Sequence, residues 1–151
     1  MTIKNNEDND LEKPIEIKKN YGKTNKRKGS NAEREYAKVF REELGYTHCK
    51  TSRFGSKLHD NAGIDLICVP FNIQIKAGKQ IALKAHKELE YIKTQTKILF
   101  PEEAIEQNLP KILIHRREVI KGQKRDEFSD IVSMTFNDFK TLIKNYKNGN
   151  N

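Results

Sequence analysis

Three polar residues, Asp65, Gln74 and Lys76, interrupt an otherwise mostly apolar stretch, GIDLICVPFNIQIK, and their types suit a metal site. Because side chains on a strand alternate between its two faces, Gln74 and Lys76 point the same way from one strand. If the segments on either side of Pro70 pair with each other, Asp65 can join them from the neighbouring strand. A carboxylate, an amide oxygen and an ammonium would then meet beside backbone carbonyls, which suits a hard cation such as Mg²⁺.

These residues have a second interpretation, as the solvated face of an amphipathic hairpin. Both segments are rich in Ile, Val, Leu and Phe, which favours a central position in a sheet. A buried Asp or Lys is costly unless it is paired or functional. We therefore expect Asp65 and Lys76 to have a chemical role.

A second carboxylate, Glu33, lies on a predicted helix that runs from Ser30 to about Leu44. Ser30 and Glu33 have the spacing of a capping box, and Gly45 is a helix stop signal. The apolar stripe of this helix consists of Tyr36, Ala37, Phe40 and Leu44. Glu33 continues that stripe by one turn, so it either caps the helix or points across the sheet toward Asp65, and the two roles are compatible.

The other predicted elements complete an α/β domain. Strands are expected over 46–53, 64–69, 71–76, 111–116 and 130–135, and helices over 81–97 and 137–146. Ile81, Ala85, Leu89 and Ile92 form the expected seam of the first of these helices; Phe136, Phe139, Leu142, Ile143 and Tyr146 form the packing face of the second. This order predicts a central mixed β-sheet flanked by helices.

The 151 residues suit one domain, which we place at residues 30–147, with a frayed tail at 148–151. The formal net charge of +8 favours a polyanionic partner, nucleic acid before an anionic membrane surface. No apolar run is long enough to span a bilayer, and the N-terminus lacks the apolar core of a secretory signal. We expect a cytoplasmic protein, and a phage origin is compatible with this. Cys49 and Cys68 are expected to be small core residues, and neither a disulfide nor a metal pair.

Residues 1–29 are predicted to form a disordered arm because apolar residues are sparse there. Acidic residues dominate its first half, and its second half ends in Lys26, Arg27 and Lys28. The arm either follows DNA phosphates or acts as a solubilising tail. A predicted loop over 53–62 carries further candidates.

In that loop, Arg53, Ser56 and Lys57 could bind phosphate. His59 could be a ligand or a proton carrier, but a lone loop histidine is more often neither.

The run KGSNAEREYAKVFREELGYTHCKTSRFGS, followed by GIDLI and IQIKAG, resembles the archaeal-type Holliday-junction resolvases of the PD-(D/E)XK nuclease superfamily. It covers Lys28 to Gly78, about a third of the chain. The resemblance implies a restriction-endonuclease-like core, with the order α-β-β-β-α-β plus a closing strand and helix. It also implies a Mg²⁺-dependent endodeoxyribonuclease, with Mn²⁺ able to substitute, that acts on branched DNA as a homodimer.

The same resemblance assigns roles to the site residues. Glu33 is similar to the helix glutamate, Asp65 to the metal-binding aspartate and Lys76 to the catalytic lysine. The implied metal ligands are Asp65, Gln74, the Ile75 carbonyl and Glu33. The predicted DNA-binding residues are Arg34, Arg53, Ser56, Lys57, Lys26, Arg27 and Lys28.

Gln74 stands where these resolvases usually have a glutamate. An amide oxygen can ligate Mg²⁺ but brings no charge, so weaker metal binding is expected. Restriction nucleases resembling the Mrr type carry QXK here, so the change does not imply an inactive site. Two alternatives stay open: another nuclease of the superfamily, of restriction or phage DNA-processing type, and a non-catalytic DNA-binding module on the same fold.

Overall fold

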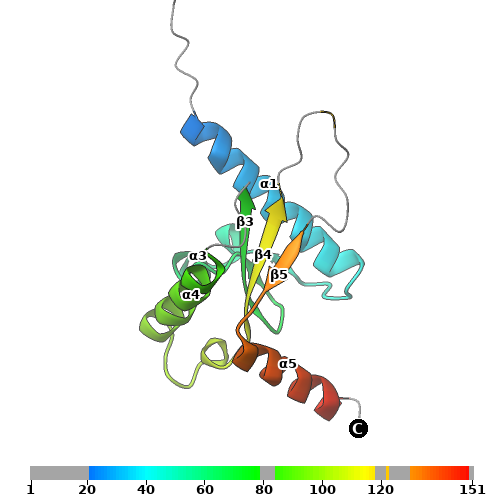
Figure 1. Cartoon of the computed structure of the whole chain (residues 1–151), viewed down its shortest axis with the longest axis vertical. Helices are drawn as coiled ribbons and strands as arrows, with labels where there is room; N and C mark the ends of the chain where they lie inside the picture. The colour runs from blue at the N-terminus through cyan, green and yellow to red at the C-terminus, as the bar shows by residue number, and fades with distance from the viewer. Residues whose placement is uncertain (1–20, 79–83, 118–121, 123–129, 150–151) are drawn as a thin grey trace, which may run out of the picture.

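A five-stranded mixed sheet forms the centre of the molecule (Figure 1). The structure is a computed structural model and describes residues 21–78, 84–117, 122 and 130–149. The strands are β1 (Lys50–Thr51), β2 (Leu66–Ile67), β3 (Asn72–Gly78), β4 (Lys111–Arg117) and β5 (Ile131–Ser133), in that order across the sheet. β3 and β4 are parallel and the other neighbours are antiparallel. The mixed α/β class is therefore as predicted.

Helices flank this sheet on both sides (Figure 1). They are α1 (Tyr21–Glu42), α2 (Ser52–Gly55), α3 (Lys57–Asn61), α4 (Ala85–Leu99), the 3₁₀ turn η1 (Ile105–Gln107) and α5 (Phe136–Gly149). Within the described ranges, no helix is long and apolar enough to cross a membrane.

The main core lies between α1 and the parallel pair β3–β4. Ala32, Ala37 and Phe40 of α1 pack with Ile73 and Ile75 of β3 and with the neighbouring isoleucines of β4. Alternation sends Asn72 and Gln74 to the opposite face, where α4 lies. A smaller cluster formed by Ala62, Ile64, Ile92 and Phe100 ties α4 to the segment before β2.

The predicted start of α1 was wrong. α1 begins at Tyr21, so Ser30 and Glu33 lie inside it and form no capping box. The part of the predicted disordered arm from Tyr21 to Gly29 is helical, in keeping with the good helix propensity of its Lys and Arg residues. The helix ends at Glu42, and the left-handed backbone of Gly45 (φ 78°) turns the chain as expected. The last predicted stripe residue, Leu44, is exposed.

The predicted strand at 46–53 and the loop after it also differ from expectation. Only Lys50 and Thr51 are extended, and α2 and α3 occupy most of the segment expected to be a mobile loop. Ser56 caps α3, because its hydroxyl accepts a hydrogen bond from the His59 backbone N–H. Local capping therefore replaces extended structure here.

The predicted pairing of β2 with β3 is confirmed, with Leu66 opposite Ile73. β2 is short because Cys68 adopts a left-handed backbone conformation (φ 63°), which ends regular pairing. Cys49 is buried, as expected, but Cys68 is exposed, so its assignment to the core was wrong.

The closing helix α5 forms where predicted, but its predicted packing face is not buried. Phe136, Phe139, Ile143 and Tyr146 are exposed and Leu142 is only partly covered, so this apolar face was wrongly assigned to the core. α4 keeps Leu89 and Ile92 buried as predicted, whereas Ile81 lies outside the described residues. The sequence also predicts a charged loop or hairpin from Arg117 to Phe128, and this segment falls largely outside the described residues.

Candidate active site

The Asp65 carboxylate lies between β2 and β3 and takes the place of a strand partner. Its Oδ2 accepts a hydrogen bond of 2.6 Å from the Ile75 backbone N–H. The Asp65 backbone is held on both sides. Its N–H donates to the Ile73 carbonyl (2.7 Å), and its carbonyl accepts a hydrogen bond from the Ser52 N–H (2.8 Å). Three hydrogen bonds thus fix this carboxylate at the start of β2.

The Ile75 carbonyl faces the same gap as Asp65. On a strand, the N–H and the C=O of one residue leave on the same side, and the Ile75 N–H points at Asp65. β2 has no residue paired with Ile75, since the β2–β3 register is limited to Leu66 and Ile73. The gap therefore contains a carboxylate and a backbone carbonyl oxygen side by side.

Burial raises the pKa of Asp65 from its ordinary 3.8 to about 7. The hydrogen bond from Ile75 and the charges of Lys76 and Arg53 lower this pKa, and the Glu33 charge raises it further. Near neutral pH this carboxyl group is poised between its two protonation states. A cation in the gap would favour the ionised form.

Gln74 brings an amide oxygen that has no partner. Its side chain is 5% exposed, and Oε1 accepts no hydrogen bond from any described residue. The Gln74 Nε2 atom lies against Gly63, which has a left-handed φ of 75°. A Cβ atom added at Gly63 would be 3.0 Å from this Nε2. A buried oxygen without a donor is unfavourable unless something binds it, so Gln74 fits a ligand role.

Lys76 follows on the same face of β3 and remains exposed. Its Nζ lies 3.5 Å from Oε2 of Glu88 on α4. Since the Lys76 charge also lowers the pKa of Asp65, the ammonium is within electrostatic reach of the carboxylate. A half-exposed ion pair of this kind is weak, so Lys76 is free to bind an anion.

Glu33 is almost fully buried and is paired with Arg53. Arg53 Nη2 lies 2.8 Å from Glu33 Oε1, and Nη1 donates to Ser30 Oγ at 3.0 Å. Burial raises the pKa of Glu33, and the Arg53 charge and hydrogen bond oppose that rise. Arg53 was predicted to contact DNA, but in this structure it offsets the charge of the buried carboxylate.

The structure therefore brings most of the predicted catalytic residues together. Glu33, Lys76 and Arg53 all act on the pKa of Asp65, and Gln74 is next to Ile75 on β3. In the part of the chain that is described, no three His, Cys, Asp or Glu side chains cluster as a metal site. A metal here would depend on two carboxylates supplemented by neutral oxygens, which is a ligand set that Mg²⁺ accepts.

Of the predicted DNA-binding residues, one group lies on α1. Lys26, Arg27 and Arg34 line a shallow groove of about 410 Å³ together with Ser30 and Asn31. Lys28 is exposed on the same helix. Arg53 reaches this groove through its hydrogen bond to Ser30, so the groove leads toward Glu33.

The other predicted phosphate ligands lie on α3 and its cap. Lys57 is exposed, but the Ser56 hydroxyl is bonded to the ring of His59 (2.7 Å to Nδ1). His59 in turn contacts Glu106 of η1 through Nε2 at 3.2 Å. This chain of contacts fastens α3 to η1, which gives His59 a structural role.

Sequence reasoning missed Ser52 and His115. Ser52 is completely buried with an unpartnered Oγ, and its N–H holds the Asp65 backbone. His115 pairs with Lys76 across β3 and β4, is 4% exposed, and has an Nε2 without a partner among the described residues. Burial lowers the pKa of His115. The strand alternation of KILIHR places His115 on the Leu113 face, but only the register between strands sets it beside Lys76.

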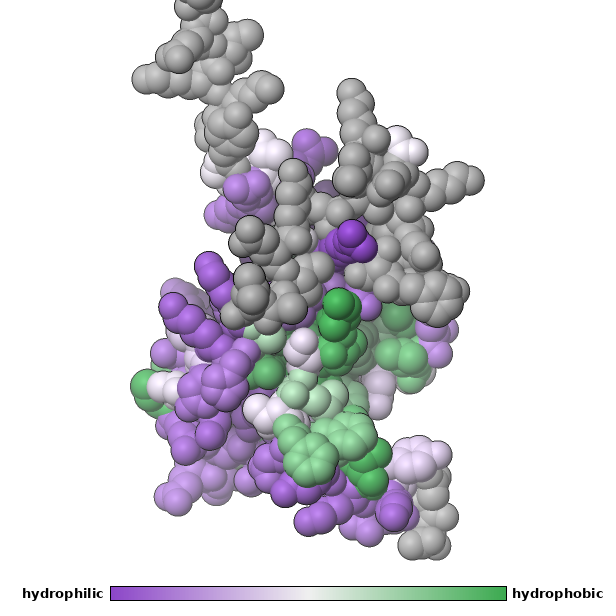
Figure 2. Space-filling view, viewed as in Figure 1, coloured by the Kyte–Doolittle hydropathy of each residue, from purple (hydrophilic) through white to green (hydrophobic). Residues whose placement is uncertain are grey.

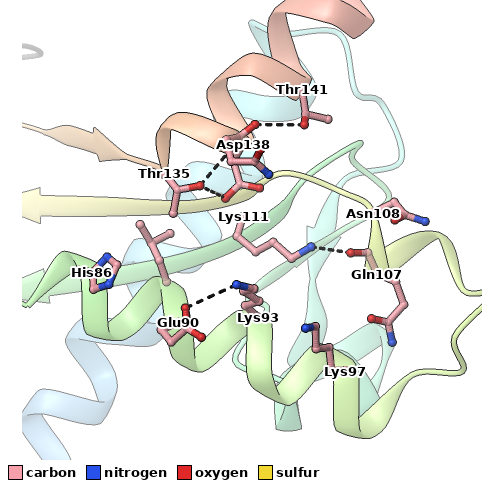
Figure 3. A pocket seen from close by; sticks show the side chains of 12 residues that line it. His86, Glu90, Lys93, Lys97, Gln107, Asn108, Lys111, Thr135, Asp138 and Thr141 are labelled. Carbon is pink, nitrogen blue, oxygen red and sulfur yellow. Dashed lines mark hydrogen bonds and ion pairs between the residues drawn. The ribbon is translucent and has the colours of Figure 1, made fainter.

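A pocket of about 540 Å³ between α4 and α5 is separate from this site (Figure 3). Lys111 reaches into it, but its Nζ donates to the carbonyls of Gln107 (2.8 Å) and Leu109 (2.7 Å). Thr135 and Asp138 form the N-terminal cap of α5. Backbone carbonyls therefore satisfy the Lys111 ammonium, and Thr135 and Asp138 are bonded to each other.

Comparisons of the chain with protein-family models, with curated proteins and with solved structures gave no match. The site is therefore interpreted from its own geometry.

We predict that Asp65 makes stability fall as pH rises from about 4 to about 7. The folded protein keeps the Asp65 proton up to about pH 7, whereas the unfolded chain loses it near 3.8, so the folded state binds more protons across this window. Asp65→Asn removes up to about 1.4 kcal/mol per pH unit of that slope. Urea unfolding in the presence of EDTA, from about pH 4 to about pH 8, measures the free energy of unfolding of both proteins and so gives the two slopes. Parallel profiles for the two proteins would contradict the burial of this carboxyl group.

Proposed function

We propose that this chain is a metal-dependent endonuclease that hydrolyses DNA phosphodiester bonds, with four-way junctions as the preferred substrate. One observation carries the proposal: an elevated-pKa carboxylate, Asp65, shares the gap beside β3 with the Ile75 carbonyl, and the preceding residue of β3, Gln74, has a buried oxygen without a partner among the described residues. Perturbed, convergent polar groups of this kind are characteristic of functional sites.

Mg²⁺ or Mn²⁺ would be held by Asp65, Gln74 Oε1 and the Ile75 carbonyl, with Glu33 as an additional carboxylate. When bound, the ion supplies Lewis-acid polarisation of the phosphate and an acidified water. Glu33 becomes available only when Arg53 moves away from it, since the two are paired at 2.8 Å. Arg53 could then neutralise a DNA phosphate.

Lys76 would bind the scissile phosphate and stabilise the charge that develops on it. Its ammonium is exposed and lies on the same face of β3 as Gln74. Release from Glu88 costs little because that pair is long and partly solvated. The basic groove on α1 would guide the DNA backbone toward this point.

We expect cleavage of a four-way junction with Mg²⁺ or Mn²⁺ and none with EDTA. Asp65→Ala and Lys76→Ala should each lower the single-turnover rate by at least about a hundredfold, because the first removes a metal ligand and the second removes the positive charge that faces the reacting phosphate. Lys93→Ala is the matched control. Lys93 lies on α4, is exposed like Lys76, and is likewise in a long ion pair, with Glu90. Gln74→Glu should lower the Mg²⁺ concentration needed for half-maximal rate.

Unchanged cleavage by both site variants would contradict the assignment of this site. Comparison of junction, flap and linear duplex separates a resolvase from other nucleases of the superfamily, because equal rates on all three exclude junction preference. The salt bridge between Glu33 and Arg53 and the neutral Gln74 favour one other candidate, a DNA-binding module without catalysis. That candidate predicts tight binding with no cleavage in Mn²⁺.

The basic groove on α1 should contribute phosphate contacts. Arg27→Ala and Arg34→Ala should each weaken DNA binding equally for all sequences and reduce the slope of log K against log salt by about 1. Lys38→Ala is the control, since Lys38 is on the same helix, is exposed and pairs with Glu42 outside the groove. Fluorescence anisotropy at salt concentrations from about 50 to about 200 mM measures this slope. Identical slopes for all three variants would exclude this groove.

We infer that a second copy of the chain covers the exposed apolar face of β5 and α5. β5 is an edge strand, and two such edges can pair antiparallel about a two-fold axis. Beside it, Val132, Phe136, Phe139 and Tyr146 are exposed, and Figure 2 shows apolar side chains gathered over β5 and α5 within a hydrophilic surround. The start of α1 lies at the opposite end of the molecule from α5 (Figure 1).

We expect sedimentation equilibrium of the wild-type protein to show a dimer. Phe139→Lys should shift it to monomer, because a charge at a buried interface is unpaired. Ile98→Lys is the control, since Ile98 is more exposed than Phe139 but lies on α4. A wild-type monomer across the micromolar range, or the same loss in both variants, would contradict this interface.

A further inference from the structure

Cys49 directly precedes β1 and Cys68 directly follows β2, at the same end of one strand ladder. β1 and β2 are antiparallel, with Lys50 opposite Ile67 and Thr51 opposite Leu66. The same register, continued by one residue, places Cys49 opposite Cys68. Antiparallel neighbours at this distance along a ladder have close Cβ atoms.

The hydrogen bonding of the ladder identifies the type of position. Ser52 donates its N–H to the Asp65 carbonyl, which is one of the two bonds of a hydrogen-bonded pair, while the Asp65 N–H goes to the Ile73 carbonyl. Hydrogen-bonded and non-hydrogen-bonded pairs alternate, which makes the pair of Cys49 and Cys68 non-hydrogen-bonded. With both residues in extended backbone, Cα atoms at such a position are about 4.5 Å apart, within the range that a disulfide spans.

The environments of the two thiols differ in a way that suits stepwise oxidation. Cys49 is 1% exposed in the core. Burial raises the pKa of its thiol, and the charge of the nearby Cys68 raises it further. Cys68 is exposed, and its φ of 63° turns it out of the strand alternation. Return of this one residue to extended backbone would place its side chain on the Leu66 face, which is also the face of Cys49.

We propose that Cys49 and Cys68 form an intramolecular disulfide when the protein meets a low-molecular-weight disulfide oxidant such as glutathione disulfide. The Cys68 thiolate attacks one sulfur of the oxidant, which releases one glutathione thiolate and forms a mixed disulfide. The Cys49 thiolate then attacks Cys68 Sγ and releases the second glutathione. Two protein thiols are oxidised and one glutathione disulfide is reduced to two glutathiones, whose thiolates take up, through solvent, the two protons that the protein thiols lose.

The bridge would join β1 to β2 beyond the point where Ser52 holds the Asp65 backbone. Its effect is a tether between the segment that carries Arg53 and the strand that begins beside Asp65. The unfolded chain would be constrained as well, so the oxidised protein should unfold at a higher denaturant concentration. This inference does not depend on the proposed nuclease activity.

The test uses the full-length wild-type protein at low micromolar concentration, incubated with glutathione disulfide and then alkylated under denaturing conditions. Intact mass should fall by two hydrogen atoms with no alkylation, and a peptide digest should contain Cys49 linked to Cys68. Dithiothreitol should restore two alkylatable thiols and the original urea midpoint. Cys49→Ser is the control variant and should stop at the Cys68 mixed disulfide with glutathione.

Two results would overturn the proposal. One is a wild-type protein that stops at the mixed disulfide, with Cys49 still open to alkylation after unfolding. The other is a disulfide between two chains through Cys68, which non-reducing gels would reveal as a covalent dimer. Both results are read from the wild-type protein, so a variant that fails to fold leaves the conclusion unaffected.

Discussion

The hydrogen bond from the Ile75 N–H to the Asp65 carboxylate is the interaction on which the candidate site depends. It replaces a backbone pairing that β2 does not make with β3, and so it holds a partly buried carboxylate at the point where two central strands separate. One hydrogen bond only partly offsets the loss of water around an ionised acid, and the raised pKa of Asp65 reflects that deficit. A cation or a proton in the gap would offset the rest of the cost of burying the Asp65 charge. The electrostatics of the fold therefore favour the metal binding that the proposed chemistry requires.

The charges around this carboxylate are arranged in pairs that can be exchanged. Glu33 is paired with Arg53, and Lys76 with Glu88, so the charged groups that surround Asp65 have counterions in the structure as described. A bound metal would give Glu33 a positively charged partner, and DNA phosphates would give Arg53 and Lys76 negatively charged partners. Exchange of these internal ion pairs for contacts with a metal and a DNA backbone would require Arg53 to leave Glu33 and Lys76 to leave Glu88. The burial of Glu33 makes its exchange the more demanding of the two.

Periodicity in the sequence was sufficient for the central elements. β3 alternates isoleucines with polar residues and β4 contains a short apolar run, and the isoleucines of each strand lie on one face against α1. The errors occurred where tertiary contacts decide. Ser30 looked like a helix cap, but its hydroxyl bonds Arg53 and the helix continues through it to Tyr21. The apolar stripe of α5 looked like a core face, since periodicity gives amphipathicity but does not specify what covers the apolar side.

The sequence by itself determined which residues share a strand or a helix face: Gln74 with Lys76, and Glu33 with the core stripe of α1. Spacing is enough for this, because the periods of strand and helix are fixed by the backbone. Only the tertiary structure decided which side chains from different elements meet. Arg53 reaches Glu33, His115 lies beside Lys76, and Asp65 bonds Ile75, because strand register and helix placement bring distant residues together. Such contacts depend on the packing of the whole domain, and no local pattern of residues encodes them.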